Sequence, residues 1–272
     1  MSAKSSLGVK LPTDINTLTA KQANEMVKCL NDVEYFIRNY VYVQHPTRGA
    51  VLFDLYDYQE RVVDSLVNHE KSIILQPRQS GKTITIVAYM LHRAIFFPDV
   101  VIGVAAHKGD GAKEVIGRFR YGYENLPLWM KPAVRSYNVF DIVFDNGSKI
   151  MSQTTTESTY RGKSLSILYL DEFAFVNPRI ETEFWKSILP TISAKGTEFV
   201  ITSTPNTSEG RFADIWFKAE RGESDFNPIR VYNEEVPDRQ ELNENGEDFK
   251  TAMLKDMTPI EYAQEYDCAF VS

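Results

Sequence analysis

The chain of 272 residues has little cysteine and histidine and no long apolar run. Its two cysteines, Cys29 and Cys268, form no CxxC pair, so we expect reduced thiols rather than a disulfide framework or a zinc site. The four histidines are scattered and include no HExxH motif. The longest apolar run, residues 100–106, is far shorter than the ~20 residues of a membrane helix, and the first ten residues lack the apolar stretch of a secretory signal. We therefore expect a cytoplasmic protein without a membrane partner.

An excess of positive charge is also missing. The formal net charge is -7, which argues against a protein that coats nucleic acid through bulk positive charge. The acidic excess is uneven, because residues 207–272 contain 7 Lys/Arg and 16 Asp/Glu. Residues 78–163 contain 12 Lys/Arg and 7 Asp/Glu, so the middle of the chain is mildly basic.

The pattern of apolar residues predicts alternating helices and strands. Helical spacing predicts helices over residues 19–42 (one helix or two), 58–68, 81–97, 110–124, 181–192 and 211–220. Short apolar runs predict buried strands at 72–76, 100–105, 167–170 and 198–202, and Asn146-Gly147 predicts a hairpin between 139–144 and 149–151. Residues 1–17 are expected to form a loose arm, and the acidic residues 233–248 a solvated loop or small subdomain. This alternation predicts an α/β fold with a doubly wound, mostly parallel sheet.

A phosphate-binding motif follows the first of these strands. The segment Gln76-Pro-Arg-Gln-Ser-Gly-Lys-Thr83 fits GxxxxGK[ST], except that Gln76 replaces the first glycine. Backbone N–H groups of such a P-loop cradle phosphates, which makes candidate nucleotide ligands of Gln79, Ser80, Gly81, Lys82 and Thr83. Lys82 is expected on the β- and γ-phosphates, and the Thr83 hydroxyl on Mg²⁺. The alternative is an ordinary strand-to-helix turn with a surface lysine.

Two carboxylates end the strand at residues 167–170, as in a Walker B motif. Asp171 is expected to hold Mg²⁺ and Glu172 to activate water. Adjacent carboxylates can divide the metal and base duties, which favours hydrolysis over nucleotide storage, although a strand ending in a solvated acidic turn is common. After the next strand come hydroxyls and an amide that either sense the γ-phosphate or simply form a turn: Thr202, Ser203, Thr204 and Asn206.

Two arginines are candidates to stabilise the charge of a transferred phosphoryl group. They are Arg78, inside the P-loop, and Arg161, before the strand at residues 167–170. Each is otherwise a surface arginine. Upstream, Tyr58 and Gln59 suit adenine through ring stacking and amide hydrogen bonds, although a buried tyrosine at a helix start is the commoner meaning.

Together these segments resemble the N-terminal packaging ATPase domain of the large terminase subunit of tailed double-stranded DNA bacteriophages. The missing first P-loop glycine, with an arginine in the loop, is usual for that family. The matching pieces run in the family's order over about residues 33–270. They are Tyr35-Phe-Ile-Arg-Asn-Tyr40, Gln44-His-Pro46, Asp57-Tyr-Gln59, Arg78-Gln-Ser-Gly-Lys-Thr83, Ala106-His-Lys-Gly109, Arg161-Gly162, Tyr169-Leu-Asp-Glu-Phe-Ala-Phe175 and Thr202-Ser-Thr-Pro-Asn206.

The resemblance implies a P-loop ATPase core of the additional-strand, conserved-glutamate type. It implies an N-terminal arm and helix over residues 1–32, a core over 33–227 and a small accessory subdomain from 228–272 with a contribution from 33–60. The implied cofactors are ATP and Mg²⁺. The implied catalytic residues are Glu172, Lys82, Arg78 and Arg161, with Arg161 completing the site of a neighbouring subunit. Residues Thr202 to Asn206 would couple hydrolysis to motion, and Tyr58 and Gln59 would contact adenine.

The implied function is that of an ATP-hydrolysing motor that translocates double-stranded viral DNA into a procapsid in the host cytoplasm. The implied partners are double-stranded DNA, the portal protein, the small terminase subunit and further copies of the chain in a ring, expected to be pentameric, although an isolated domain can be monomeric. The nuclease domain of complete family members is expected to be absent. Two alternatives stay open, a helicase-like nucleic-acid-dependent ATPase and an ATP-switched, non-catalytic assembly module. A modest basic patch suits a motor that grips and releases DNA at every step.

Overall fold

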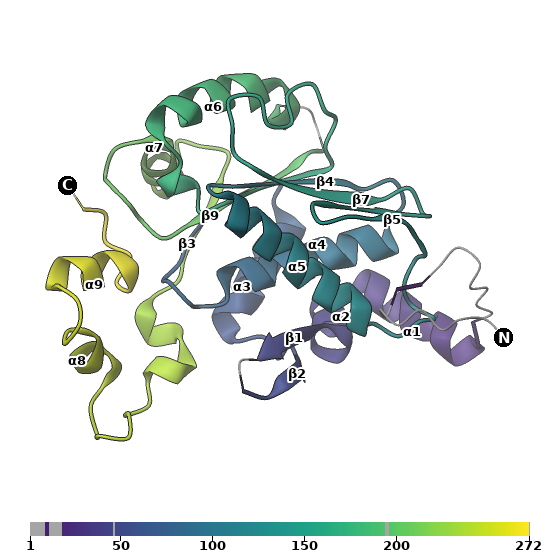
Figure 1. Ribbon diagram of the computed structural model, residues 1–272, viewed down its shortest axis with the longest axis horizontal. Coiled ribbons are helices and arrows are strands. Elements are labelled where there is room, and N and C mark those ends of the chain that lie inside the picture. The colour runs from purple at the N-terminus through teal and green to yellow at the C-terminus, as the bar shows by residue number, and fades with distance from the viewer. Residues whose placement is uncertain (1–8, 11–17, 46, 194–195, 272) are drawn as a thin grey trace.

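A mixed sheet forms the middle layer of the molecule (Figure 1). The computed structural model describes residues 9–10, 18–45, 47–193 and 196–271. In spatial order the strands are β10 (Asn227–Arg230), β3 (Lys71–Leu75), β9 (Glu198–Ser203), β8 (Ile167–Asp171), β4 (Val101–Ala106), β7 (Lys149–Thr154), β6 (Asp141–Phe144) and β5 (Val134–Tyr137). The pairs from β10 to β7 are parallel, and β6 and β5 add antiparallel pairs. The predicted mostly parallel sheet is confirmed. One strand, β9, separates the P-loop strand β3 from β8, as in the additional-strand type.

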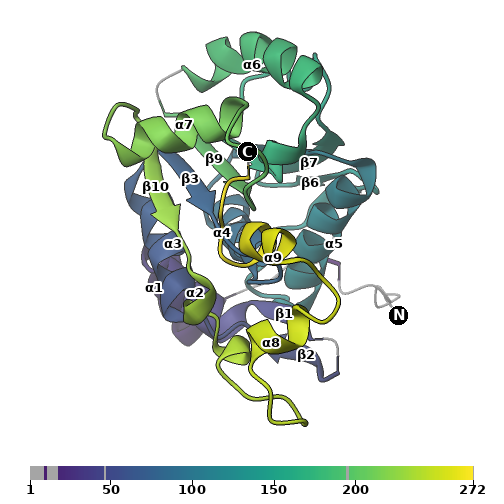
Figure 2. The same cartoon turned by 90° about the vertical axis from the view of Figure 1, so that its left-hand side faces the viewer.

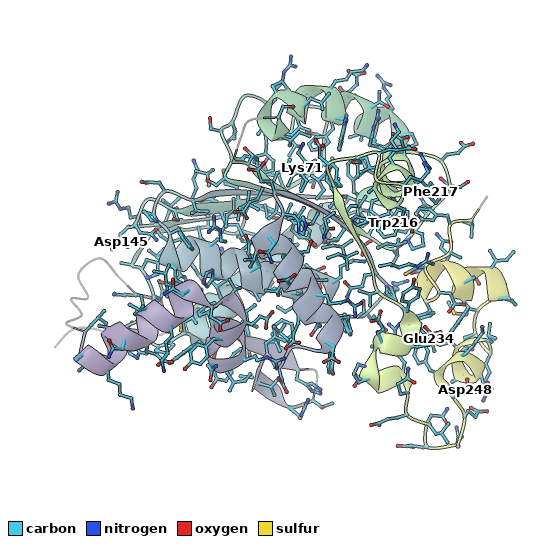
Figure 3. The ribbon with its side chains drawn as sticks, turned by 180° about the vertical axis from the view of Figure 1, so that it is seen from behind. Lys71, Asp145, Trp216, Phe217, Glu234 and Asp248 are labelled. Atoms are coloured by element: carbon cyan, nitrogen blue, oxygen red, sulfur yellow. The ribbon has the colours of Figure 1, made fainter. Side chains whose placement is uncertain are left out.

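Helices cover both faces of this sheet (Figure 1). One face carries α1 (Ala20–Asn31), α2 (Val33–Tyr40), α3 (Asp57–Asn68), α4 (Lys82–Phe96) and α5 (Gly109–Asn125), and the other carries α6 (Pro178–Ile192) and α7 (Arg211–Glu220). Each face has its own apolar core, with Phe36 and Phe119 in one and Phe184 and Trp216 in the other. Trp216, on α7, is 1% exposed and lies beside the sheet in Figure 3. Because both faces are covered, β8 is buried along its whole length, as its apolar sequence predicts.

The predicted helices and strands are present, with ends shifted by a few residues. The predicted helical stretch at 19–42 is two helices, because the Asp32 carboxylate caps α2 by accepting from the Tyr35 N–H at 2.8 Å. The predicted Asn-Gly hairpin is the β6–β7 pair. Sequence analysis missed β5 and a separate hairpin of β1 (Tyr42–His45) and β2 (Gly49–Leu52). Both cysteines are buried and free of disulfides, as expected.

The end of the chain forms what we call the C-terminal segment, residues 231–271, beside the carboxyl ends of the parallel strands (Figure 2). It contains two short 3₁₀ turns, η2 (Asn233–Glu235) and η3 (Pro237–Arg239), and the helices α8 (Phe249–Met253) and α9 (Pro259–Glu265). Glu234 and Asp248 mark it in Figure 3, at the side of the molecule opposite Asp145. A third 3₁₀ turn, η1 (Phe173–Phe175), follows β8.

Two predicted boundaries need correction. The core boundary at residue 227/228 falls inside β10, because Pro228 pairs with Ile73 in the main sheet. Proline is tolerated there because β10 is an edge strand, so a proline did not mark the end of the sheet. Of the predicted loose arm, residues 1–8 and 11–17 lie outside the described residues. The described Lys10 is tied to the sheet, since its carbonyl accepts from the Val134 N–H at 2.8 Å.

Candidate active site

The loop between β3 and α4 has the backbone shape of an anion-binding site. Gly81 is the N-cap of α4 at φ +79°, and Gln79 is at φ +57°. A side chain at Gly81 would be strained and would also lie 2.5 Å from the Gln59 Nε2 atom, so this position requires glycine. The first N–H groups of an α-helix have no intrahelical acceptor, and the helix dipole makes this end positive. The loop therefore offers its N–H groups to a phosphate.

Three buried side chains hold this loop through one carbonyl group. The Ser80 carbonyl accepts hydrogen bonds from the Tyr58 hydroxyl at 2.8 Å, the Gln76 Nε2 at 2.9 Å and the Gln59 Nε2 at 3.5 Å. Burial raises the pKa of Tyr58, which keeps its hydroxyl a donor. The Gln59 Oε1 accepts from the Tyr56 N–H at 3.0 Å, so this amide is engaged at both ends. Tyr58 and Gln59 are thus placed to support the loop, and their contact with adenine stays a prediction.

Lys82 and Glu172, two of the predicted catalytic residues, meet in an ion pair. The Lys82 Nζ lies 2.6 Å from the Glu172 Oε1, and Lys82 is 7% exposed. Glu172 follows β8 in the left-handed region at φ +52°, a conformation that costs a non-glycine residue energy and is concentrated at functional sites. Its Oε2 accepts from the Ser203 hydroxyl at 3.3 Å and the Thr204 N–H at 3.2 Å. Glu172 therefore touches both the P-loop lysine and the loop after β9.

Asp171 is buried among hydroxyl groups. Its Oδ1 accepts from the Tyr169 hydroxyl at 2.5 Å and from the Thr83 and Thr202 hydroxyls at 3.3 Å each. Burial, and then the negative charge of Glu172, raise the pKa of Asp171. The predicted metal ligands Thr83 and Asp171 are thus brought together, and they supply the oxygen donors that Mg²⁺ prefers.

This donor set is too small to hold a metal ion by itself. Across the described residues, no group of three or more His, Cys, Asp or Glu is placed to bind a metal. Mg²⁺ is commonly held by one or two protein oxygens together with substrate phosphates and water. The residues present therefore fit a magnesium–nucleotide complex better than a metal site built from protein alone.

The predicted coupling residues contact the end of β8. Thr202 bonds to Asp171, and Ser203 and Thr204 bond to Glu172. The Asn206 amide donates to the Ala174 carbonyl in η1 at 3.0 Å. The four residues thus form a continuous contact with the two carboxylates and the turn that follows them.

One cavity of about 270 Å³ gathers most of the predicted site residues. Arg78 to Thr83, Asp171 and Glu172 line it together with residues that sequence analysis left unassigned, namely His107, Gly111, Glu114 and Arg118. Burial lowers the pKa of His107, which favours its neutral form. These four residues follow β4 at spacings of four, three and four, the spacing of one helix face, at the edge of the sheet where such ligands bind. That spacing was the signal that sequence analysis overlooked.

Comparison with known proteins identifies the family. The family profile described as "Terminase large subunit, T4likevirus-type, N-terminal" matches residues 73–272. The chain belongs to this terminase family. Among curated proteins, tripartite terminase subunit 3 of Equine herpesvirus 1 (strain Ab4p) is 25% identical over 186 residues, which is 64% of this chain and 24% of the relative. The chain thus spans about a quarter of the length of the herpesvirus terminase subunits that it matches.

Solved terminase structures share the fold. The large terminase ATPase domain of Thermus phage P74-26 matches with a TM-score of 0.67 at 19% identity, over 80% of this chain and 95% of that domain. The large terminase of bacteriophage HK97 matches with a TM-score of 0.68 at 15% identity, over 89% of this chain and 55% of that protein. The large terminase of another thermophilic bacteriophage, in complex with ATP-gamma-S, matches with a TM-score of 0.60 at 13% identity, over 80% and 53% respectively. The predicted terminase ATPase fold is confirmed.

The two predicted arginines of this terminase domain lie in different places. Arg78 is at the mouth of the cavity, 64% exposed, with its guanidinium 3.8 Å from the Glu265 carboxylate. Arg161 lines a separate groove of about 500 Å³ with Lys163 and Lys186. Its role in a neighbouring subunit's site stays a prediction. Elsewhere, the described part of the chain has no helix with the length and apolar character needed to cross a bilayer.

Proposed function

We propose that this chain is the ATP-hydrolysing motor domain of a terminase that translocates double-stranded viral DNA into a procapsid. The observation that carries the proposal is the meeting of Lys82, Thr83, Asp171 and Glu172 around one cavity beside a glycine-capped helix N-terminus. Terminase family membership and the complex of a thermophilic phage terminase with ATP-gamma-S support a nucleotide as the occupant.

Each residue has a distinct task in this reaction. The P-loop N–H groups and Lys82 bind the phosphates and neutralise their charge. Thr83 and Asp171 would hold Mg²⁺, which supplies charge neutralisation between the β- and γ-phosphates when it is bound. Glu172 orients the attacking water and takes its proton, for which its carboxylate must leave the ion pair with Lys82. Ser203 and Thr204 follow Glu172 through their hydrogen bonds, so its movement reaches the loop after β9.

The proposed partners follow from family membership. They are double-stranded DNA, a portal protein, a small terminase subunit and further copies of this chain, acting in the host cytoplasm. The herpesvirus relative is named as one subunit of a tripartite terminase, which supports work within an assembly. The mildly basic middle of the chain is suited to weak, reversible contact with a phosphate backbone.

Replacing Glu172 by glutamine tests the catalytic proposal. Glutamine keeps the shape of the side chain but cannot accept the proton, so ATP hydrolysis is expected to fall by roughly 10²- to 10⁴-fold. Binding of a fluorescent ATP analogue is expected to change little, because the phosphates are held by the P-loop. Phosphate release measures the first quantity and fluorescence titration the second.

Glu209→Gln is the matched control, because Glu209 is exposed after β9 and lies outside the cavity lining. Wild-type hydrolysis in Glu172→Gln would refute the catalytic role of Glu172. ATP binding without any hydrolysis in the wild-type chain, with and without double-stranded DNA, would instead favour the ATP-switched assembly module.

A further inference from the structure

The C-terminal segment holds the P-loop by the backbone of Arg78. The Arg78 N–H donates to the Glu265 carbonyl in α9 at 2.9 Å, and the Arg78 carbonyl accepts from the Arg239 guanidinium. Both backbone polar groups of Arg78 are therefore bonded to residues more than 150 positions away in the sequence. Figure 2 shows α9 in front of the strand ends where this contact is made.

Arg239 is itself held in place on every side. It is 8% exposed, although it lies in the acidic stretch that we expected to be solvated. Its guanidinium lies 5.1 Å from the centre of the Phe249 ring and 5.0 Å from that of Tyr266, and it also donates to the Asn233 side chain. Arginine can serve two acceptors and two rings at once because its guanidinium is planar and carries five N–H donors.

The same segment reaches the loop after β9. The Gln264 amide donates to the Pro205 carbonyl at 3.1 Å, and the Val271 N–H donates to the Asn206 carbonyl at 3.1 Å. The end of the chain thus bonds to the P-loop on one side and to the predicted coupling loop on the other.

We infer that Arg239 is a positioning residue that makes the C-terminal segment follow the conformation of the P-loop. The peptide after Arg78 leads into Gln79 at φ +57°, so any change in this part of the loop moves the Arg78 carbonyl. Because Arg239 is packed between two aromatic rings, that movement is carried into α8 and α9 rather than absorbed by side-chain rotation. The inference rests on the proposed function, since a nucleotide is what changes the loop.

The test compares Arg239→Lys with Arg230→Lys by amide hydrogen exchange on the whole chain, with and without Mg²⁺ and ATP-gamma-S. Arg230 is a matched control, because it also stacks on an aromatic ring, Tyr232, and donates to the carbonyls of Asp267 and Cys268. Those bonds tie it to the C-terminal segment without a contact to the P-loop.

In the wild type, nucleotide is expected to slow exchange both in residues 76–83 and in residues 259–271. In Arg239→Lys the first effect should persist, while opening of residues 259–271 becomes roughly tenfold more frequent and loses its response to nucleotide. Arg230→Lys should speed exchange in residues 259–271 but keep the response.

A full response of residues 259–271 in Arg239→Lys would overturn the inference, as would its loss in both variants, which would show a merely structural effect. Failure of the proposed function is distinguishable from either result. In that case nucleotide would leave exchange in residues 76–83 of the wild-type chain unchanged.

Discussion

Gln76 occupies the position where the generic P-loop motif has glycine, and the structure gives its side chain a task. It is 1% exposed, and its amide donates to the Ser80 carbonyl beside Tyr58 and Gln59. A glycine there would remove this brace. The residue that makes the motif imperfect is therefore one that stabilises the loop, which motif matching alone does not show.

His92 provides a prediction on pH at the same scale. Its Nε2 bonds to the Cys29 carbonyl at 2.8 Å, and its Nδ1 is buried without a partner. Burial lowers the pKa of His92 from 6.5 to about 4. The unfolded chain therefore takes up a proton near pH 6.5, whereas the folded chain does so only near pH 4. At about 1.4 kcal/mol per pH unit, the free energy of unfolding should fall by roughly 3 kcal/mol from this residue between those pH values.

Urea unfolding from pH 7 to pH 4 measures this loss. His92→Gln keeps a donor toward Cys29 but does not titrate, so its stability should fall less steeply with acid than that of the wild type. His45→Gln leaves His92 in place and should retain the wild-type slope. Equal slopes for wild type and His92→Gln would contradict the prediction.

At the scale of elements, the β6–β7 hairpin shows how one turn anchors two parts of the fold. Gly147 is at φ +85°, and a side chain added there would run into the Asp99 carboxylate. The neighbouring Asn146 donates to the Ala94 carbonyl at 2.9 Å, and its own carbonyl accepts from the Asp99 N–H at 3.1 Å. The turn is thus tied to the end of α4.

Gly147→Ala is expected to cost more than backbone strain alone. Positive φ costs alanine about 1 kcal/mol, and displacement of Asp99 adds to this, so we expect a loss of about 2 kcal/mol in the free energy of unfolding. Gly246, at φ +77°, has open space around it, so Gly246→Ala isolates the backbone cost. Urea unfolding of both variants checks the comparison, and equal losses would show that Asp99 contributes nothing.

At the scale of the whole molecule, the sheet order places the two arginine candidates in different environments. The cavity with Lys82 and the groove with Arg161 have no lining residue in common. If Arg161 completes a neighbour's site, each active site needs residues from two chains. Catalysis should then depend on assembly, and the rate per subunit should rise with protein concentration.

Mixing two inactive variants tests this shared site. Lys82→Ala and Arg161→Ala should each lose at least about 10³-fold in ATP hydrolysis, as removal of an arginine finger does. A mixture should regain activity, because an Arg161→Ala subunit keeps its own P-loop and can receive Arg161 from a Lys82→Ala neighbour. Arg179→Ala, which changes an exposed arginine on α6, should behave as wild type. Absence of rescue at every ratio, under conditions where rings form, would exclude a shared site.

Local sequence was sufficient for the main elements and for the residues at the strand ends. Apolar runs with both faces buried, such as Ile167–Leu170, and helix periods such as that of α4 are local patterns, and Lys82, Thr83, Asp171 and Glu172 follow them directly. Edge elements were harder to predict. In β10 and in the β1–β2 hairpin, few side chains are fully buried, so the apolar pattern that marks a strand is weak.

The sequence by itself determined the α/β class, the P-loop and the pair of carboxylates, because these depend on neighbouring residues and on the short period of helices and strands. Only the tertiary structure decided which side chains meet. Tyr58 and Gln59 bond to Ser80, Arg239 bonds to Arg78, and His107 and Arg118 enter the cavity. Their pairing depends on strand order and on chain segments far apart in sequence, and hydrogen bonds between such segments leave no periodic signal along the chain.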